Sequence, residues 1–468
     1  MKYYNITSNY KKLLADTLTP VSIYLRLRDK YAGSILLESS DYHGNDNSFS
    51  YICCSPYASI TASKASVTID YPDGISEAKE LGPNSLIKCI DEFKDSFITE
   101  PSDFKFSTNG LFGYLAYDAV QQFEDIKFNN QNDEIPDAIY KVYRFVIVID
   151  HFKNELYVFE HRLETDNISK LDQLVSLIKR HDIPQFDFDL SGKETSNYSD
   201  DEFLEIIKKG QSHCLRGDVF QIVLSRRFQN EFKGDEFNVY RSLRSINPSP
   251  YLFYFDYGSY KIFGSSPESQ IVISGNKASI YPIAGTFKRT GDDAADAELA
   301  KQLTEDEKEN AEHIMLVDLA RNDLSRSAAH VEVEVFKEVQ YYSHVIHLVS
   351  KVTGQLEAAQ SRLQLVGDTF PAGTLSGAPK YRALQLIDNY ENQSRSYYGG
   401  AIGFLGFNGD FNHAIMIRSF LSKDSKLHYQ AGAGVVAKSV PESELNEVDN
   451  KLAALRNAIA QAVKINRS

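Results

Sequence analysis

The stretch TEDEKENAEHIMLVDLARNDLSR, residues 304–326, combines many acidic residues with regularly spaced apolar ones. The apolar residues recur at spacings of three and four, which predicts an amphipathic helix with an apolar stripe of Ala311, Ile314, Met315 and Leu319. Glu309 and Glu312 are one helical turn apart, so both carboxylates lie on one face. The stretch therefore predicts a helix that presents a carboxylate pair.

A second acidic helix is predicted in SVPESELNEVDNKLAAL, residues 439–455. Its apolar stripe consists of Leu445, Val448, Leu452 and Leu455, and another face carries Glu444, Glu447 and Lys451. Two helices that each offer a carboxylate pair can together hold Mg²⁺, which prefers oxygen ligands and needs only one or two protein carboxylates beside an anionic substrate. The alternative interpretation is two solvated helix faces.

The composition is that of an ordinary globular protein, long enough for two domains. The chain has 468 residues, of which 42% are hydrophobic and 24% charged, and its formal net charge is −14. It has no basic tail or cluster, so nucleic acid is not an expected partner. No apolar run approaches the roughly 20 residues that span a bilayer, and the N-terminal residues lack the apolar core of a signal peptide. We therefore expect a cytoplasmic protein without membrane contact.

A polar segment rich in Asp, Ser and Gly, residues 185–197, is predicted to be a linker. We place a first domain at residues 1–190 and a second at residues 198–468. Directly after the linker, Ser199 and Glu202 form a capping-box pattern, which predicts that a helix begins here.

Strands and helices alternate through the second domain. The turn dipeptides Ser274-Gly275 and Asn408-Gly409 predict hairpins and therefore antiparallel pairing, which indicates an α+β fold rather than a doubly wound parallel sheet. We expect one strand over residues 411–420. It contains Arg418 among mostly apolar residues, where a guanidinium must be paired, either with an internal carboxylate or with the carboxylate of a ligand.

A glycine pattern near this strand needs a separate interpretation. Residues 432–437, GAGVVA, satisfy the G-x-G-x-x-A pattern of dinucleotide sites, but Pro441 and the second acidic helix follow, so no βαβ unit can form. We expect instead that the backbone N–H groups of these glycines approach a carboxylate.

Two further polar features stand in apolar surroundings. The small-residue loop PAGTLSGAPK, residues 371–380, opens a predicted helix and is suited to hold an oxyanion with Thr374 and Ser376, although it could equally be a simple turn. His347 alternates with apolar residues and is either a base or a structural core histidine.

These stretches belong to an ordered series of motifs, namely SPES at 266–269, PIAGT at 282–286, DEKENAEHIMLVDLARND at 306–323, HLVS at 347–350, PAGTLSGAPK at 371–380, YGGAIG at 398–403, IRS at 417–419, AGAGVV at 431–436 and NEVDNK at 446–451. The series closely resembles that of the chorismate-utilising enzymes and extends from about residue 36 to residue 452. The resemblance implies large antiparallel β-sheets packed together and flanked by helices, with the active site between them.

The resemblance also implies roles for individual residues. Glu312 and Glu447 would bind Mg²⁺, with Glu309 and Glu444 beside them. Chorismate would be held by a set of substrate-binding residues, Tyr398, Arg418, Gly432, Ala433, Gly434 and Lys451.

Three catalytic steps are implied as well. Glu268 would be the general acid that protonates the departing C4 hydroxyl, and ammonia would then add at C2. His347 and Thr374 would act in the following elimination of pyruvate, which makes the ring aromatic.

Two positions indicate which branch of the family the chain resembles. Water-adding relatives carry a catalytic Lys where this chain has Gln221, and an amide cannot act as a base at neutral pH. Relatives that make aminodeoxychorismate carry a nucleophilic Lys in place of Ala284. We therefore expect conversion of chorismate and ammonia to anthranilate and pyruvate, in tryptophan biosynthesis. An aminodeoxychorismate-forming variant that works without the Lys is the alternative.

A regulatory site and a partner are implied in the same way. The stretches LLES and NPSPY resemble the tryptophan feedback pocket of the family, which is formed here by Glu38, Ser39, Pro250 and Tyr251. No glutaminase nucleophile motif surrounds any of the four cysteines, so we expect a separate glutamine amidotransferase subunit that supplies ammonia. A non-catalytic tryptophan-sensing protein is the remaining alternative.

Overall fold

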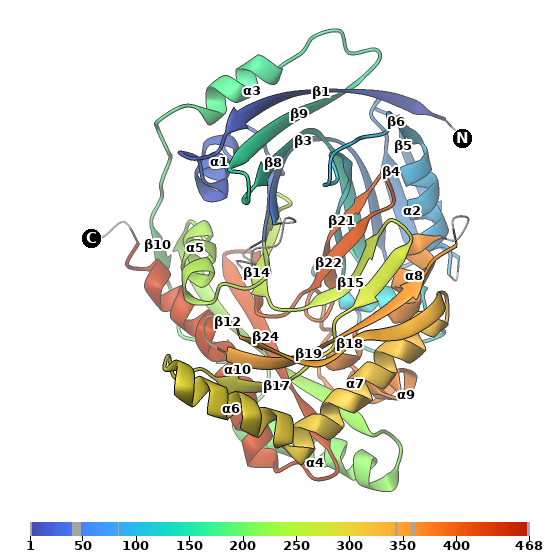
Figure 1. Cartoon of the computed structure of the whole chain (residues 1–468), viewed down its shortest axis with the longest axis vertical. Helices are drawn as coiled ribbons and strands as arrows, with labels where there is room; N and C mark the ends of the chain where they lie inside the picture. The colour runs from blue at the N-terminus through green and yellow to red at the C-terminus, as the bar shows by residue number, and fades with distance from the viewer. Residues whose placement is uncertain (1, 40–47, 83, 342–344, 358–360, 466–468) are drawn as a thin grey trace.

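The computed structural model describes residues 2–39, 48–82, 84–341, 345–357 and 361–465. Figure 1 shows a large curved β structure with helices around it. Between the described strands the pairing is antiparallel, except that β1 (Tyr4–Leu14) and β6 (Phe97–Thr99) run parallel. The predicted α+β class, with antiparallel sheets flanked by helices, is confirmed.

The sheet branches at β8 (Ala138–Asp150), because this strand pairs with β3 on one edge and with both β7 and β9 on the other. The first arm leaves through β3 and follows the pairing order β3 (Phe49–Ser63), β2 (Ile35–Glu38), β13 (Tyr251–Asp256), β14 (Tyr260–Ser266), β23 (Ser419–Lys423), β24 (Lys426–Val436) and β12 (Gln221–Gly234). Further strands pair with members of this arm or with β8. Strand β9 (Glu155–Leu163) pairs with β8, β4 (Ser66–Asp70) pairs with β3, and β5 (Ser76–Glu80) pairs with β4. Strand β12 also pairs with β10 (Phe188–Leu190), β11 (Thr195–Ser196) and β20 (Gly377–Ala378).

The second arm leaves through β7. Its pairing order is β7 (Gly110–Leu115), β21 (Ala401–Gly406), β22 (Phe411–Ile415), β15 (Ser269–Ser274), β16 (Lys277–Ile280) and β19 (Val345–Gln355), and β19 also pairs with β17 (Ile283–Lys288) and β18 (Ala329–Tyr341).

The chain crosses from one arm to the other at two adjacent places. Pro267 and Glu268 connect β14 of the first arm to β15 of the second, and residues 416–418 connect β22 of the second arm to β23 of the first. The two crossings are joined by backbone hydrogen bonds, from Ile415 N to Glu268 O at 2.9 Å and from Ser265 N to Arg418 O at 3.1 Å. Two predicted site residues therefore lie side by side where the sheets meet.

The helices are α1 (Pro20–Leu27), α2 (Leu86–Asp95), α3 (Leu171–Ile178), α4 (Asp200–Arg216), α5 (Phe237–Ile246), α6 (Asp293–Glu305), α7 (Glu307–Ser325), α8 (Arg362–Thr369), α9 (Lys380–Tyr390) and α10 (Pro441–Ala462), with 3-10 turns η1 (Tyr117–Gln122) and η2 (Gly373–Leu375). Helix α7 packs on β17, β18 and β19, and α10 packs on β24, α4 and α5. The two predicted acidic helices thus cover different arms (Figure 1).

The start of α4 confirms the capping box. The Ser199 hydroxyl accepts a hydrogen bond from Glu202 N, and the Glu202 carboxylate accepts one from Ser199 N. The helix ends at Gly217, whose φ of 82° places it in the left-handed region that favours glycine.

The predicted apolar stripe of the first acidic helix is wrong. Ile314 is 44% exposed, and the apolar residues that α7 buries are Leu316, Val317, Ala320 and Leu324. The inward face of α7 also carries half-buried Glu309 and Glu312. Acidic residues occupy part of the inward face of α7. The spacing of its apolar residues therefore predicted the wrong face to be buried. For α10 the prediction is confirmed at Val448, Leu452 and Leu455, which are buried.

The single strand predicted over residues 411–420 is also wrong. Strand β22 ends at Ile415 and β23 begins at Ser419, and Arg418 between them has a φ of 48°. The chain must turn here because it passes from one arm to the other.

Candidate active site

Glu268 lies at the centre of the candidate site. Its carboxylate accepts a hydrogen bond of 3.1 Å from the Thr374 hydroxyl, which comes from η2. Burial raises the pKa of Glu268 to about 7, while the Thr374 hydrogen bond and the charges of Lys451 and Arg418 act in the opposite direction. A carboxyl group with this pKa holds a proton in part of the population at neutral pH, as a general acid requires.

Arg418 faces Glu268 from the neighbouring crossing. Within the described part of the chain its guanidinium forms no ion pair or hydrogen bond, and its electrostatic neighbours are Glu268 and His347. Burial lowers the pKa of Arg418, because the protein interior disfavours the charged form. Of the two interpretations that the sequence left open, the structure favours a guanidinium kept for the carboxylate of a ligand.

His347 lies on β19 and is 5% exposed. Its Nδ1 is 3.1 Å from the carbonyl oxygen of Gly285, and because a carbonyl only accepts, Nδ1 carries the hydrogen. Burial lowers the pKa of His347 to about 4, so the ring is neutral at pH 7 and Nε2 is the nitrogen that can take a proton. A neutral ring is the form that a general base requires.

Gln221 lies between the first acidic helix, α7, and strand β24. It begins β12, and its Nε2 donates to Glu312 Oε1 at 3.2 Å. Gly434 on β24 lies directly beneath this amide, since a Cβ at that position would stand 2.5 Å from Gln221 Nε2. A side chain at this position would therefore displace the Gln221 amide from its present place.

Lys451 connects the second acidic helix to the same strand. Its Nζ is 2.6 Å from Glu447 Oε1 and donates to the carbonyl of Gly432 at 2.9 Å. Tyr398 is 4% exposed and interacts with the Gly432 backbone and the charge of Glu447, and burial raises its pKa. Gly432 and Gly434 thus face the site from one side of β24.

Three other predicted residues lie at its margin. Ala433 points away from the site into the hydrophobic core, so that only its backbone can contact a ligand. Glu309 lies beside Gly285, where its Oε2 would be 3.3 Å from an added Cβ, and Glu444 is 4% exposed.

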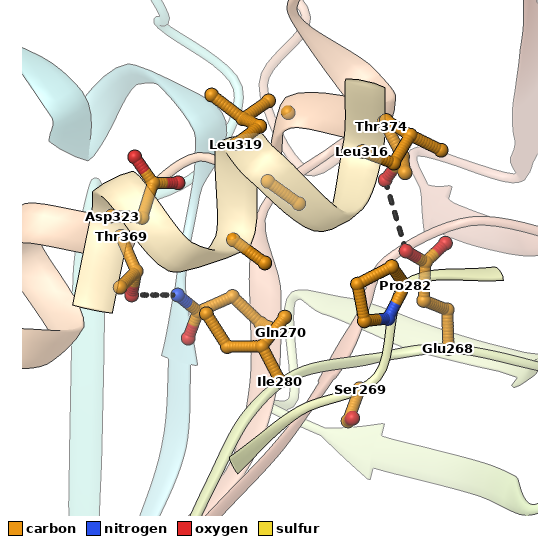
Figure 2. A pocket seen from close by; sticks show the side chains of 13 residues that line it. Glu268, Ser269, Gln270, Ile280, Pro282, Leu316, Leu319, Asp323, Thr369 and Thr374 are labelled. Atoms are coloured by element: carbon orange, nitrogen blue, oxygen red, sulfur yellow. Dashed lines mark hydrogen bonds between the residues drawn. The ribbon is translucent and has the colours of Figure 1, made fainter. Parts of the chain in front are cut away.

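A cavity of about 40 Å³ adjoins Glu268 between α7, β15 and η2 (Figure 2). It has room for about three or four waters, at on the order of 10–15 Å³ each. Its polar lining includes Gln270, Asp323, Thr369 and Thr374, and Gln270 donates to Thr369 Oγ1 at 2.8 Å. The Gln270 side-chain oxygen is buried and has no described partner, so the cavity offers an unused acceptor near Glu268.

The chain resembles known proteins along most of its length. A family model described as chorismate binding enzyme matches residues 34–457. Anthranilate synthase component 1 of Aquifex aeolicus (strain VF5) is 38% identical over 479 residues, covering 97% of this chain and 95% of the relative. The crystal structure of anthranilate synthase component I from Streptococcus pneumoniae TIGR4 is similar with a TM-score of 0.76 and 30% identity, covering 96% of this chain and 100% of that chain.

The chain belongs to the family of chorismate binding enzymes. The menaquinone-specific isochorismate synthase of Escherichia coli shares the fold with a TM-score of 0.73 and 17% identity, covering 98% of this chain and 95% of that chain. Among the described helices none is long and apolar enough to cross a membrane.

In a chorismate binding enzyme the acidic helices have to be tested as a metal site. Among the described residues no three Asp, Glu, His or Cys side chains converge as a protein-only metal cage requires. Mg²⁺ does not require such a cage, because waters and an anionic substrate supply its other ligands. Glu312 accepts a hydrogen bond from Gln221 and forms no ion pair within the described residues. The donor set therefore fits Mg²⁺ bound together with substrate.

The four residues predicted for the feedback pocket lie next to one another. Glu38 on β2 is opposite Leu252 on β13, so Pro250 and Tyr251 approach the end of LLES, where Ser39 is half-buried. The Glu38 carboxylate is 5% exposed and bonds to Tyr240 Oη at 2.6 Å and to Arg244 Nη2 at 2.9 Å.

Motif matching alone did not identify the buried ion pairs around the site. Lys380 Nζ is 2.9 Å from Asp323 Oδ2, each side chain is 9% exposed, and the pair joins α7 to α9 beside the cavity. Arg395 and Glu391 form a second pair. The sequence carried no clear signal for these pairs, because Glu391 and Arg395 lie in the polar stretch ENQSRS and Asp323 is one of many charged residues in its motif.

Proposed function

We propose that this chorismate binding enzyme is the chorismate-converting component of an anthranilate synthase, which forms anthranilate and pyruvate from chorismate and ammonia. The observation that carries the proposal is Glu268, a carboxyl group with a pKa of about 7 that lies between the cationic Arg418 and Lys451. Chorismate carries two carboxylates and a poor leaving group, so it needs cationic groups to hold it and an acid to release the C4 hydroxyl.

Binding would use the two glycines and the cations around them. Arg418 would pair with one substrate carboxylate, and Lys451 and Tyr398 would contact neighbouring oxygens. The backbone of residues 432–434 would approach the same carboxylate closely because neither glycine carries a side chain.

The acidic helices would hold Mg²⁺ through Glu312 and Glu447, with Glu309 and Glu444 close to its waters. When bound, the ion would supply positive charge to the ring carboxylate and draw electrons from the ring. Gln221 would orient Glu312 through its hydrogen bond.

The chemistry would proceed in two stages. First, Glu268 gives its proton to the C4 oxygen, and the C4–O bond breaks with release of water. Ammonia forms a bond to C2 as the ring double bonds shift, and the new ammonium group then loses a proton to solvent. Second, the neutral His347 takes the proton at C2, the C3–O bond breaks, and the released enolate takes a proton to become pyruvate. Thr374 would keep the carboxyl of Glu268 oriented through both stages.

The residues at 221 and 284 favour anthranilate over other products. Gln221 donates to Glu312 and cannot activate water as a Lys would. Ala284 on β17 is 7% exposed and offers no nucleophile for a covalent route.

Ammonia would come from a glutamine amidotransferase subunit, and tryptophan would inhibit. The tryptophan ammonium would bind Glu38, and the indole would lie between Pro250 and Tyr251. The pocket is connected to the active site through Ser265, whose hydroxyl donates to the carbonyl of Asn247 and whose N–H donates to Arg418 O at 3.1 Å. A ligand that shifts the NPSPY loop would therefore displace Arg418.

The test is turnover by the purified chain with chorismate, an ammonium salt and Mg²⁺, with and without tryptophan and EDTA. We expect fluorescent anthranilate and pyruvate, lost with EDTA and suppressed by tryptophan. A 4-amino product would assign the chain to aminodeoxychorismate formation. Tryptophan binding without any product would assign it to the non-catalytic sensors.

A further inference from the structure

Arg395, between α9 and β21, is a buried charge for which the proposed chemistry has no direct use. It is 2% exposed, and its guanidinium forms a two-point ion pair with Glu391, from Nε to Oε2 at 2.8 Å and from Nη2 to Oε1 at 2.5 Å. Burying such a pair costs desolvation energy that the attraction does not always recover, so its presence is weak evidence for a stabilising role.

The remaining donors of Arg395 bind the backbone of two elements of the active site. Nη1 donates to the carbonyl of Leu375 at 2.6 Å, and Nη2 donates to the carbonyl of Val223 at 2.7 Å. Leu375 directly follows Thr374, which bonds to Glu268. Val223 is two residues after Gln221 on β12, so the two side chains share a face of the strand.

The Arg395 guanidinium also lies near the rings of Tyr117 and Tyr398, the second of which is a predicted substrate-binding residue. Its carbon is 4.9 Å from the ring centre of Tyr117 and 5.8 Å from that of Tyr398, distances at which a cation is attracted to a ring face. Three separate segments that carry Thr374, Gln221 and Tyr398 thus meet at one side chain.

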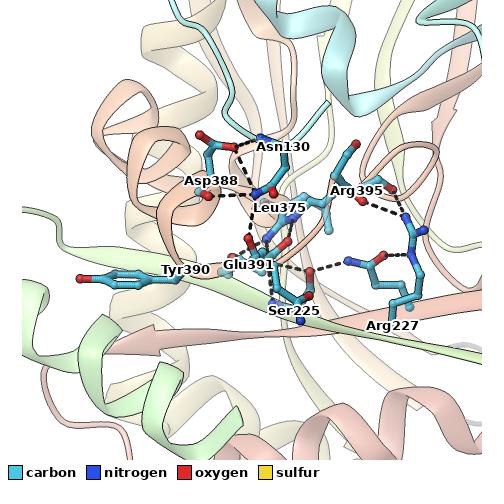
Figure 3. A network of polar contacts seen from close by, with 12 residues as sticks. Asn130, Ser225, Arg227, Leu375, Asp388, Tyr390, Glu391 and Arg395 are labelled. Atoms are coloured by element: carbon cyan, nitrogen blue, oxygen red, sulfur yellow. Dashed lines mark hydrogen bonds and ion pairs between the residues drawn. The ribbon is translucent and has the colours of Figure 1, made fainter. Parts of the chain in front are cut away.

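Glu391 holds the guanidinium from the other side and connects it to the strand below. Its Oε1 accepts from Ser225 N at 2.9 Å and from Ser225 Oγ at 2.7 Å. Ser225 is opposite Gly432 in the pairing of β12 with β24 and accepts a hydrogen bond of 2.7 Å from Gln430. Figure 3 shows these contacts arranged around the ion pair.

We propose that Arg395 is a positioning residue of the active site: it fixes the Leu375 carbonyl, the Val223 carbonyl and the Tyr398 ring so that Thr374, Gln221 and Tyr398 face the substrate. Every guanidinium nitrogen of Arg395 donates to a protein acceptor, so the residue acts through its neighbours and does not bind substrate. This differs from Arg418, which has no such acceptor in the described residues.

The decisive variant is Arg395→Lys. Lysine keeps the positive charge, but a single nitrogen cannot reach both oxygens of Glu391 and two carbonyls in the same plane. Loss of one hydrogen bond to a charged group changes an opening equilibrium by about tenfold or more. We therefore expect amide hydrogen exchange in residues 371–380 to accelerate about tenfold or more.

Amide exchange does not depend on the proposed function, so this experiment tests the role of Arg395 even if the chain makes no anthranilate. The matched control is Arg144→Lys, which alters another ion-paired arginine, bonded to Glu160 and to the carbonyl of Ile168, away from the site. Unchanged exchange in residues 371–380 of Arg395→Lys would overturn the proposal.

A second experiment rests on the proposed function and measures the pH dependence of kcat. Burial raises the pKa of Glu268, and the groups that oppose this rise are the Thr374 hydroxyl, Lys451 and Arg418. If Arg395→Lys releases Thr374 from Glu268, the pKa of Glu268 rises and the alkaline limb of kcat moves to higher pH. Thr374→Val should produce the same shift, and the double variant should show no further shift. Independent, additive shifts would contradict the proposal.

If Arg395→Lys does not fold, Glu391→Gln provides the same test. It keeps the size of the side chain and removes one charge of the pair, so the guanidinium loses its alignment while its carbonyl acceptors stay in place. We expect faster exchange in residues 371–380 here too. Exchange as slow as in the unsubstituted chain would overturn the proposal.

Discussion

At the scale of single residues, the candidate active site pairs an acid, Glu268, with a base, His347, and burial shifts the pKa of both side chains. In the proposed mechanism Glu268 has to hold a proton and His347 has to lack one at the same pH. Burial disfavours the charged form of both groups, which raises the pKa of Glu268 to about 7 and lowers that of His347 to about 4. One physical effect thus prepares an acid and a base in a single pocket.

The acid role predicts a pH dependence. Because Glu268 acts in its protonated form and its pKa is about 7, kcat should fall as pH rises through about 7. The measurement is kcat between pH 6 and pH 9 with the concentration of unprotonated ammonia held constant. Glu268→Gln should lower kcat by about 10²–10⁴-fold, the usual contribution of general acid catalysis, and should remove this limb. A variant that keeps the limb would show that another group titrates.

The sequence was informative about which residues serve the site and less so about how they are held. Glu268, Arg418 and His347 could be identified because each is a polar residue inside an ordered motif. The left-handed backbone of Arg418 could not be predicted, since it results from the crossing between two strands far from each other in the pairing order.

At the scale of elements, α7 is the least typical helix. It presents Glu309, Glu312 and Asp323 toward the protein, and Lys380 on α9 neutralises the last of these with a 2.9 Å contact. Burial raises the pKa of Asp323, and Lys380 opposes that effect. This ion pair fastens α7 beside Glu268, so the helix that carries the candidate metal ligands is fixed at one end.

Removing one partner of this pair should be costly. Lys380→Met leaves the Asp323 carboxylate buried without a cation, and we expect a loss of about 3–5 kcal/mol in the free energy of unfolding. Replacing both, with Asp323→Leu added, should cost clearly less because no lone charge remains. Urea unfolding of the two variants measures this difference. Equal losses in both variants would contradict the assignment of a coupled pair.

The sequence predicted helices and their buried faces correctly where the local residue pattern decides them, and wrongly where the surrounding structure decides them. The capping box of α4 is local, so Ser199 and Glu202 were sufficient to place it. The inward face of α7 was misassigned because Leu316 and Ala320 share it with glutamates. No helix was predicted over residues 293–305, where the structure has α6 directly before α7.

At the scale of the whole molecule, the two arms of the sheet bring distant segments together. Strand β2 pairs with β13 and β7 pairs with β21, so pairing crosses the boundary predicted between residues 1–190 and 198–468. We propose that residues 185–197, which include β10 and β11, connect two units whose sheets are continuous. The proposed feedback pocket would then lie on one such pairing, between Glu38 and β13.

This arrangement predicts how feedback is lost. Glu38→Gln keeps the bond from Tyr240 but removes the charge that would bind the ammonium of tryptophan. The tryptophan concentration for half inhibition should rise about tenfold or more, since a charge-assisted hydrogen bond is lost. Glu160→Gln, at another buried glutamate, is the matched control and should leave inhibition unchanged. Equal inhibition of Glu38→Gln and the unsubstituted chain would place tryptophan elsewhere.

The central claim is that ammonia is added at C2 of chorismate, and ¹⁵N-labelled ammonium tests it most directly. The purified chain is given chorismate, Mg²⁺ and the labelled salt, and the product is examined by NMR. The account predicts pyruvate and an aromatic product with ¹⁵N on the carbon next to the one that bears the carboxylate. Label on the carbon opposite the carboxylate, or release of an unlabelled hydroxylated product, would contradict it.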